Sequence, residues 1–183
     1  MADDGQVIHT VVKRKCVFHI VKFGEKINAF ETSDIIACLP DCQIVTARKF
    51  DNTPEEIVIT ADTMVFLDDQ RLGKPHDEAE ALSMLTALSG RKHKVCTGVT
   101  VRQGEKALTR TQSTDVYFRE VSRQELLAYI RGGEPMDKAG AYGVQGQGAL
   151  LVERIDGDFF NVMGLPVVLL SRMLAEFGVT LLA

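Results

Sequence analysis

Asp62 and Lys74 are the two side chains whose types and surroundings first suggest chemistry. Asp62 stands between two apolar runs, Ile57–Thr60 and Met64–Leu67, and Lys74 follows in the tripeptide Gly73-Lys74-Pro75. A carboxylate held rigidly between strands can act as a general base or bind a metal ion, and a lysine offers a phosphate a compact positive charge. The alternative for Asp62 is a structural residue that accepts hydrogen bonds from N–H groups at a strand end.

A glycine-rich segment from Gly133 to Gly148 supplies a second lysine, Lys138, and a side-chain amide, Gln145. Its five glycines would weaken the interior of a helix or strand, but they allow the backbone to approach a ligand closely. A long irregular surface connection is the alternative interpretation, although loops of this length in compact domains are usually functional.

These residue types together are consistent with a nucleotide pocket. Lys74 and Lys138 would bind the phosphates, and Gln145 would form hydrogen bonds with the edge of a base. Asp62 would activate water, and a Mg²⁺ ion held by carboxylates would bridge the phosphate oxygens. The common nucleotide motifs, G-x-x-x-x-G-K-[ST] and G-x-G-x-x-G before a helix, are absent from the sequence.

The elements that must position these residues are predicted to be strands and helices in alternation. The apolar runs on both sides of Asp62 predict two strands, and Asp68-Asp69-Gln70 predicts the turn that brings Lys74 alongside. A helix is predicted over Asp77–Leu88, because acidic residues fill its first turn and Gly90 follows its end.

The rest of the chain carries further signals of both kinds. Side-chain patterns predict a strand over His93–Arg102 and its hairpin partner over Ala107–Phe118, and a capping box from Ser122 to Glu125 predicts a helix over Arg123–Arg131. The remaining predicted elements are strands over Val7–Val12, Cys16–Phe23, Cys42–Thr46 and Val179–Leu182, helices over Glu31–Leu39 and from Pro166, and a hairpin that pairs Ala149–Ile155 with Phe159–Met163.

The predicted fold class is α/β, with a mixed, largely antiparallel sheet flanked by helices. A length of 183 residues predicts a single domain over residues 1–183. Hydrophobic residues make up 45% of the chain and charged residues 25%, which is ordinary for a soluble globular protein. A net charge of −4 argues against binding to a nucleic acid polymer or an anionic membrane, and the apolar runs are too short to span a bilayer.

The remaining reactive side chains favour structural roles. The four cysteines lack zinc spacing, so reduced thiols in a cytoplasmic protein are expected, with Cys96 in the core. His93 is predicted to be structural because no acidic partner is evident. Glu134 and Asp137 are expected either to bind a metal ion or to be solvated at a helix end, and Asp158 is expected in a hairpin turn.

Several motifs resemble those of the Maf family in their residues and in their order along the chain. They extend over roughly residues 57 to 170, and the long lysine- and glycine-containing motif is the most specific. The motifs are Ala61-Asp62-Thr63, Gly73-Lys74-Pro75, Leu88-Ser89-Gly90 with His93, Thr97-Gly98, the segment GEPMDKAGAYGVQG from Gly133 to Gly146, and Gly157-Asp158 with Asn161-Val162-Met163-Gly164-Leu165-Pro166.

The resemblance implies a nucleoside triphosphate pyrophosphatase that cleaves dTTP, UTP or modified pyrimidine nucleotides to the monophosphate and pyrophosphate. By the same resemblance, Asp62 is the proton acceptor and Lys74 lies beside the phosphates. Thr63 and Gln145 correspond to positions that tune substrate choice. The implied architecture is elongated and two-lobed, similar to that of inosine triphosphatases, in a homodimer that needs a divalent cation such as Mg²⁺ or Mn²⁺.

Residues 1–56 depart from the family pattern. Maf sequences begin with a strand that leads into a Ser-x-Ser-Pro-Arg-Arg loop, which grips the triphosphate, and no such motif occurs in this segment. Lys13-Arg14-Lys15 lies near the corresponding end of the chain but lacks the Ser-Pro turn, so the arginine roles are not transferred to it. Two alternatives therefore stand beside an active enzyme: a nucleotide-binding or regulatory protein impaired in catalysis, and a subunit whose partner supplies phosphate ligands.

Overall fold

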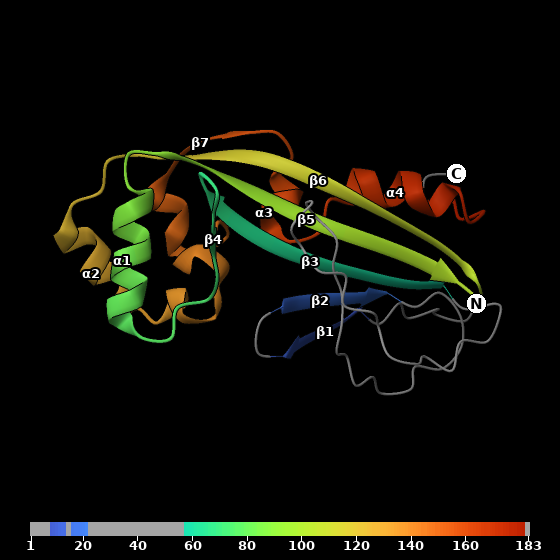
Figure 1. The fold of residues 1–183 in the computed structure, drawn as a ribbon, viewed down its shortest axis with the longest axis horizontal. Helices are drawn as coiled ribbons and strands as arrows, with labels where there is room; N and C mark the ends of the chain where they lie inside the picture. The colour runs from blue at the N-terminus through green and yellow to red at the C-terminus, as the bar shows by residue number, and fades with distance from the viewer. Residues whose placement is uncertain (1–7, 14–15, 22–56, 182–183) are drawn as a thin grey trace, which may run out of the picture. The chain divides into compact units, whose positions relative to one another are not determined.

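A five-stranded sheet is the main element of the fold (Figure 1), in a computed structural model that describes residues 8–13, 16–21 and 57–181. The strands are antiparallel; for example, Val65 pairs with Leu72 and Val116 with Ile155. This sheet, with the helices beside it, confirms the predicted α/β class. In the order β4-β3-β5-β6-β7, the strands are β4 (Gln70–Leu72), β3 (Ile57–Leu67), β5 (Lys92–Gln103), β6 (Lys106–Phe118) and β7 (Val152–Asp156).

Strand β3 corrects the prediction of two strands around Asp62. The two apolar runs form one continuous strand of 11 residues, and Asp62 lies inside it. The reason is that Thr63 and Asp62 interrupt the apolar sequence but not the hydrogen-bonding backbone, which tolerates a buried polar side chain that has partners. The predicted turn after β3 is confirmed, with Asp68 in the left-handed region at φ 52°.

The described residues of the N-terminal part form a second, two-stranded sheet. Strands β1 (Ile8–Lys13) and β2 (Cys16–Val21) pair antiparallel, with Ile8 opposite Val21. The two strands predicted on either side of Lys13-Arg14-Lys15 are therefore confirmed, and they pair with each other. The predicted helix over Glu31–Leu39 and strand over Cys42–Thr46 lie outside the described residues.

Helices α1 (Glu78–Leu88) and α2 (Arg123–Arg131) begin where their capping residues predict. Asp77 Oδ1 accepts from the Glu80 N–H at 2.8 Å, and Ser122 and Glu125 exchange hydrogen bonds in a complete capping box. Gly90 follows α1 with φ +67°, the left-handed conformation that glycine adopts without a steric penalty. The side chains on the inner faces of both helices are buried in one hydrophobic core.

The C-terminal part differs from the prediction in two places. The prediction of a hairpin between Ala149–Ile155 and Phe159–Met163 is wrong, because Phe159–Met163 forms the short helix α3. Asp158 Oδ1 accepts from the Phe160 N–H at 2.8 Å, so it caps a helix and does not serve a hairpin turn. Helix α4 (Val167–Ala175) follows Pro166 as expected, but residues 179–181 do not form the predicted strand.

The described residues belong to two compact units. One unit is drawn from Met1–Asp62, Gly98–Thr111 and Val167–Ala183, and the other consists of Thr63–Thr97 and Gln112–Pro166. The second unit contains the core beneath α1 and α2, and with it most of the residues that the sequence marks for function. None of the helices among the described residues is long and apolar enough to cross a membrane. The core of this unit includes Val65, Leu67, Leu72, Leu85, Leu88, Val95, Val116, Phe118, Leu126, Ile130 and Leu151.

Candidate functional site

Asp62 and Thr63 are consecutive residues of β3 with different surroundings. Asp62 is buried, with 4% of its surface exposed, whereas Thr63 is half-buried. Thr63 Oγ1 lies 2.8 Å from Thr97 Oγ1 on the neighbouring strand β5. Consecutive side chains of a strand point to opposite faces of the sheet, so Thr63 faces Thr97 while the Asp62 side chain lies on the other face.

The hydrogen bond between Thr63 and Thr97 continues into α3 through Asn161, which is fully buried. Thr97 Oγ1 donates to the Asn161 main-chain oxygen at 3.0 Å. The Asn161 side-chain amide donates to the Val95 carbonyl at 3.0 Å and to Thr114 Oγ1 at 2.9 Å. A strand residue of the candidate site is thus connected to a helix more than 60 positions later in the chain.

Sequence reasoning did not identify Thr97, Asn161 or Thr114 as members of this network. In the sequence, Thr97 and Asn161 stand out only as members of family motifs, and Thr114 only as part of a predicted strand. The one available signal was an Asn inside an apolar run, between Phe160 and Val162, because an amide buried with such neighbours needs several hydrogen-bond partners.

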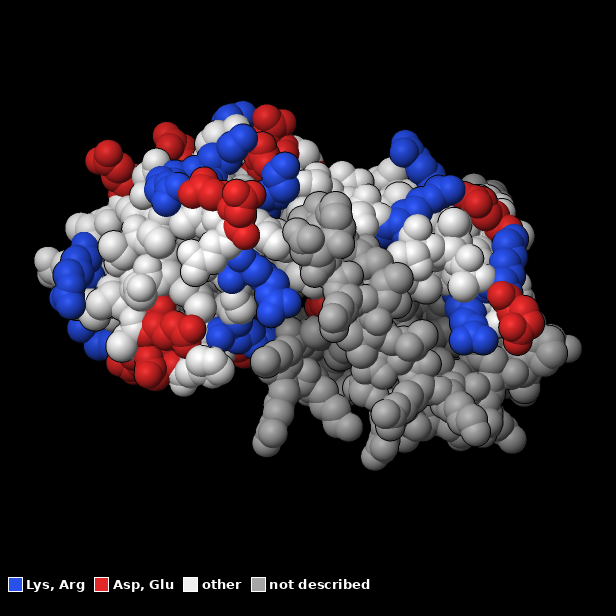
Figure 2. Space-filling view, in the orientation of Figure 1, with Lys and Arg blue, Asp and Glu red and all other residues white. Residues whose placement is uncertain are grey.

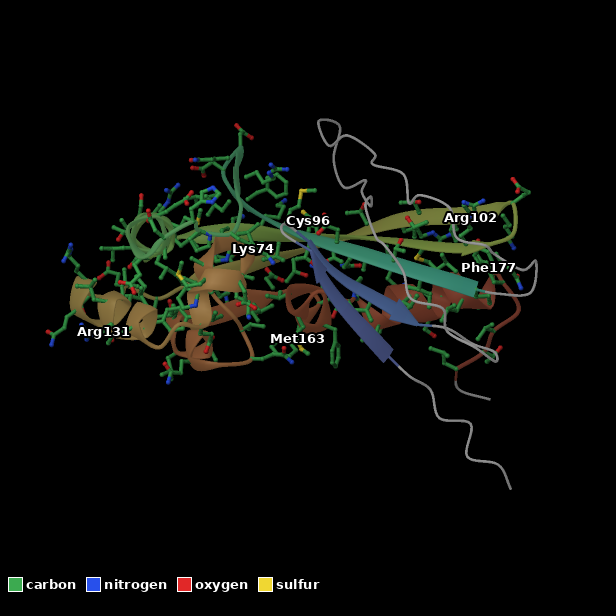
Figure 3. The ribbon with its side chains drawn as sticks, turned by 90° about the horizontal axis from the view of Figure 1, so that it is seen from below. Lys74, Cys96, Arg102, Arg131, Met163 and Phe177 are labelled. Atoms are coloured by element: carbon green, nitrogen blue, oxygen red, sulfur yellow. The ribbon has the colours of Figure 1, made fainter. Side chains whose placement is uncertain are left out.

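Lys74 and Lys138 lie on two segments that are joined by a main-chain hydrogen bond. The Gly140 N–H donates to the Gly73 carbonyl at 3.0 Å, so the segment after β4 runs beside the segment that carries Lys138 (Figure 3). Gly140 has φ +73°, and a Cβ there would lie 3.0 Å from Val65 Cγ1, so this close approach requires glycine. The two predicted phosphate-binding lysines are therefore brought together by their backbones.

The surroundings of these lysines suit an anion. Strand β4 pairs antiparallel with β3, with Leu72 opposite Val65, so the chain runs back along β3 toward Thr63 when it reaches Lys74. Lys138 Nζ lies 2.6 Å from Asp137 Oδ1 in an exposed pair, which is a weak competitor for a phosphate. Figure 2 shows Lys and Arg side chains gathered on this face over the region of β4, although the chain as a whole is acidic.

The Glu134 carboxylate is a shared hydrogen-bond acceptor for the glycine-rich segment. Its Oε2 accepts from the Gln147 N–H at 2.8 Å, and its Oε1 accepts from the Gly148 N–H at 3.1 Å and from the Tyr129 hydroxyl at 3.0 Å. Partial burial raises the pKa of Glu134, but the N–H groups of Gly148 and Gln147 and the Tyr129 hydroxyl hold it below its usual value. An ionised carboxylate is therefore an internal ligand of this segment.

Two glycines of the segment are explained by close contacts with groups of the protein. A Cβ at Gly146 would lie 2.3 Å from Glu134 Oε2, and one at Gly148 would lie 2.6 Å from the Gly143 carbonyl and 2.7 Å from the Tyr129 hydroxyl. The prediction that glycine permits a close backbone approach holds, but at these positions the partners are groups of the protein itself. Glu134, with its oxygens bonded in this way, is poorly placed to bind a metal ion.

Gln145 is exposed at the tip of a turn in this segment. The Gly146 N–H donates to the Gly143 carbonyl at 3.4 Å, which places Gln145 at the third position of the turn. The turn is anchored on both sides, because the Gly143 N–H donates to the Tyr129 hydroxyl at 3.1 Å and Gln147 and Gly148 bind Glu134. An amide presented in this way can form hydrogen bonds with a ligand from outside.

His93 has a structural role, in agreement with its expected place in the chain. It is 2% exposed, its Nε2 lies 2.8 Å from the Tyr142 hydroxyl, and its ring packs edge-on against Phe118 and Tyr142. Burial lowers the pKa of His93 to about 4, and the nearby Asp115 only partly offsets this. The ring is therefore neutral at physiological pH and holds Tyr142 at the start of the turn. Cys96 is buried, as predicted.

Comparison with known proteins places the chain in a family. Residues 26–177 match the family described as Maf-like protein. A dTTP/UTP pyrophosphatase of Bacillus velezensis is 52% identical over 126 residues, which is 69% of this chain and 67% of the relative. One of Aquifex aeolicus is 45% identical over 149 residues (76% and 78%), and one of Methanosarcina mazei is 48% identical over 126 residues (68% and 64%). The chain therefore belongs to the Maf family.

Proposed function

We propose that this protein is a nucleoside triphosphate pyrophosphatase that hydrolyses dTTP, UTP or modified pyrimidine nucleotides to the monophosphate and pyrophosphate, and so removes them from the nucleotide pool. The observation that carries the proposal is the 45–52% identity to relatives named dTTP/UTP pyrophosphatase. The placement of Lys74, Lys138 and Gln145 in the second compact unit supports it, since a triphosphate needs cations and a base needs an oriented polar group.

Asp62 is the proposed general base. Its carboxylate takes a proton from water, the water oxygen forms a bond to the α-phosphorus, and the bond from that phosphorus to the bridging oxygen of the β-phosphate breaks. Pyrophosphate leaves with the electron pair of the broken bond. The position of Asp62 inside a long paired strand supports this role, because a base that cannot move keeps its distance from the attacking water.

Lys74 and Lys138 are proposed to neutralise the negative charge that the leaving pyrophosphate carries. Charges that are in place before the reaction stabilise the transition state without a cost of reorganisation. The backbone hydrogen bond between Gly140 and Gly73 fixes the two lysine segments to each other, which is the arrangement that such a role needs.

A divalent cation, Mg²⁺ or Mn²⁺, is the proposed cofactor. The described residues include no group of three or more His, Cys, Asp or Glu side chains that could hold a metal ion. Mg²⁺ commonly keeps water and phosphate oxygens among its ligands, so the triphosphate itself would supply part of the coordination of the ion. When bound, the ion supplies charge that favours attack at phosphorus.

Thr63 and Gln145 are the proposed selectors of the base. Gln145 is exposed on an anchored turn, and its amide carries both a donor and an acceptor for the edge of a pyrimidine. Thr63 is half-buried, with its hydroxyl bonded to Thr97, so its methyl and hydroxyl groups have a fixed orientation. A fixed orientation is what discrimination between similar nucleotides requires.

A second candidate function follows from the divergent residues 1–56. Because this segment lacks a Ser-Pro-Arg-Arg motif, the chain would bind the triphosphate with fewer cationic groups, at about 1.5–3 kcal/mol for each charge-assisted bond. A Maf-family protein that binds nucleotide without turnover, or that uses a partner's residues, is the alternative. We further propose a single domain over residues 1–183, a homodimer, a cytoplasmic location, and no nucleic acid partner.

Product analysis separates the two functions. The full chain is incubated with UTP or dTTP and Mg²⁺ or Mn²⁺, and the phosphorus products are resolved by ³¹P NMR. If the protein is the proposed enzyme, equal amounts of monophosphate and pyrophosphate should form, and excess EDTA should prevent their formation. Orthophosphate with the nucleoside diphosphate would contradict cleavage at the α-phosphorus. Thermal stabilisation by UTP without products would favour the binding protein.

A further inference from the structure

The turn that carries Gln145 is held by one carboxylate and one phenol, and nothing in the reaction itself uses either group. Glu134 binds the chain after the turn through the N–H groups of Gln147 and Gly148, at 2.8 and 3.1 Å. Tyr129 binds the chain before the turn by accepting from the Gly143 N–H at 3.1 Å. All these residues belong to the same compact unit.

The two anchors are coupled to each other. The Tyr129 hydroxyl donates to Glu134 Oε1 at 3.0 Å, so the phenol that accepts from Gly143 is itself oriented by the carboxylate. Burial raises the pKa of Tyr129, so the hydroxyl keeps the proton that it donates. Loss of Glu134 would therefore loosen both ends of the turn.

We propose that Glu134 is a positioning residue for base selection, which acts by holding Gln145 at a fixed place and orientation. The inference rests on the proposed function, in which Gln145 contacts the pyrimidine. A fixed amide can pair with the N3–H donor and O4 acceptor of uracil or thymine, whereas cytosine presents an acceptor and a donor in the opposite order. A mobile amide can turn over and satisfy either base.

Glu134→Gln tests this role because it preserves the size of the side chain. Its amide nitrogen must face at least one of the N–H donors, so one hydrogen bond is lost and the charge disappears. Glu125→Gln is the matched control. Glu125 also accepts from a main-chain N–H, that of Ser122 at 2.9 Å, but it caps α2 and has no hydrogen bond to the turn.

The experiment measures kcat/KM for UTP and CTP and the exchange rates of the Gln147 and Gly148 amide hydrogens in the full chain. We expect Glu134→Gln to lower the UTP-to-CTP ratio about tenfold, mainly through KM for UTP, because a misplaced contact weakens binding. Exchange at both amides should accelerate about tenfold or more. Glu125→Gln should change the ratio and these two rates less than about twofold.

Two results would overturn the inference: unchanged exchange at Gln147 and Gly148, or faster exchange with an unchanged nucleotide ratio, which would make Glu134 merely structural. If Glu134→Gln does not fold, Tyr129→Phe releases the turn from its other side and must lower the same ratio. If the wild-type protein binds but does not hydrolyse UTP, the proposed function fails, and the ratio of dissociation constants for UTP and CTP tests the inference instead. Absence of nucleotide binding would reject both.

Discussion

Thr63 and Thr97 share a hydrogen bond whose direction is set by a third residue. Thr97 Oγ1 donates its single proton to the Asn161 main-chain oxygen at 3.0 Å, so Thr63 is the donor in the 2.8 Å bond between the two hydroxyls. The Thr63 hydroxyl proton is thereby directed into the sheet. In its proposed role in base selection, Thr63 would offer a substrate its hydroxyl oxygen as an acceptor and not its proton.

Thr97→Val is expected to destabilise the fold by about 1–3 kcal/mol, because it leaves the buried Asn161 carbonyl and the Thr63 hydroxyl without this partner. Urea denaturation followed by circular dichroism measures the change. Thr100→Val is the control: Thr100 Oγ1 also lies 2.8 Å from a threonine hydroxyl, that of Thr109, but this pair is exposed to water. Its loss should cost less than about 0.5 kcal/mol. Equal losses for the two variants would contradict the role of the buried chain of hydrogen bonds.

Gly146→Ala is expected to destabilise the protein by roughly 2–4 kcal/mol, because its Cβ would lie 2.3 Å from Glu134 Oε2 and would displace a carboxylate held by three hydrogen bonds. Gly73→Ala provides the comparison, since a Cβ there meets nothing within 4 Å, and it should change stability by less than about 0.5 kcal/mol. Thermal unfolding of both variants measures the difference. A wild-type melting temperature for Gly146→Ala would show that Glu134 moves aside freely.

Stability is expected to depend on pH through His93. Its pKa is about 4 in the folded protein and 6.5 in an unfolded chain, so the unfolded state binds the additional proton between these values. Stability therefore falls as the pH drops from 6.5 to 4, by about 3 kcal/mol in all, and this contribution is fully present above pH 6.5. Urea titrations at several pH values measure the slope.

His93→Phe should flatten that dependence, since phenylalanine takes up no proton. The exposed His76 supplies the control, and His76→Gln should keep the wild-type slope over the same range. A slope that survives in His93→Phe would assign the dependence to other groups.

Local signals in the sequence predicted a large part of this fold. Asp77 and Ser122 accept hydrogen bonds from main-chain N–H groups at the starts of their helices, and Gly90 follows the end of α1 in a left-handed conformation. The helices begin and end where these residues indicate. The failure at Phe159–Met163 has the same local origin. Asp158 can serve a turn or cap a helix, and an apolar run of five residues does not decide between them.

Long-range partners account for what the sequence did not reveal. Residue types identified Asp62, Lys74, Lys138 and Gln145 as candidates, and the family motifs added Thr63. The pairing of Gly73 with Gly140, and the chain from Thr63 to Asn161, depend on contacts across 34 to 67 positions. The glycine content of residues 133–148 indicates that the main chain lies very close to another group, and it therefore predicts a ligand-binding loop. Composition does not show which group this is, and in the structure it includes the Glu134 carboxylate.

The most direct measurement is the rate of pyrophosphate release from UTP by Asp62→Asn in the presence of Mg²⁺. The amide matches the carboxylate in size but accepts no proton, so kcat should fall at least about 100-fold while the far-ultraviolet circular dichroism is retained. Asp69→Asn, at an exposed carboxylate of the following turn, should keep the wild-type rate. Equal rates for Asp62→Asn and the wild-type protein would contradict the assignment of Asp62 as the base.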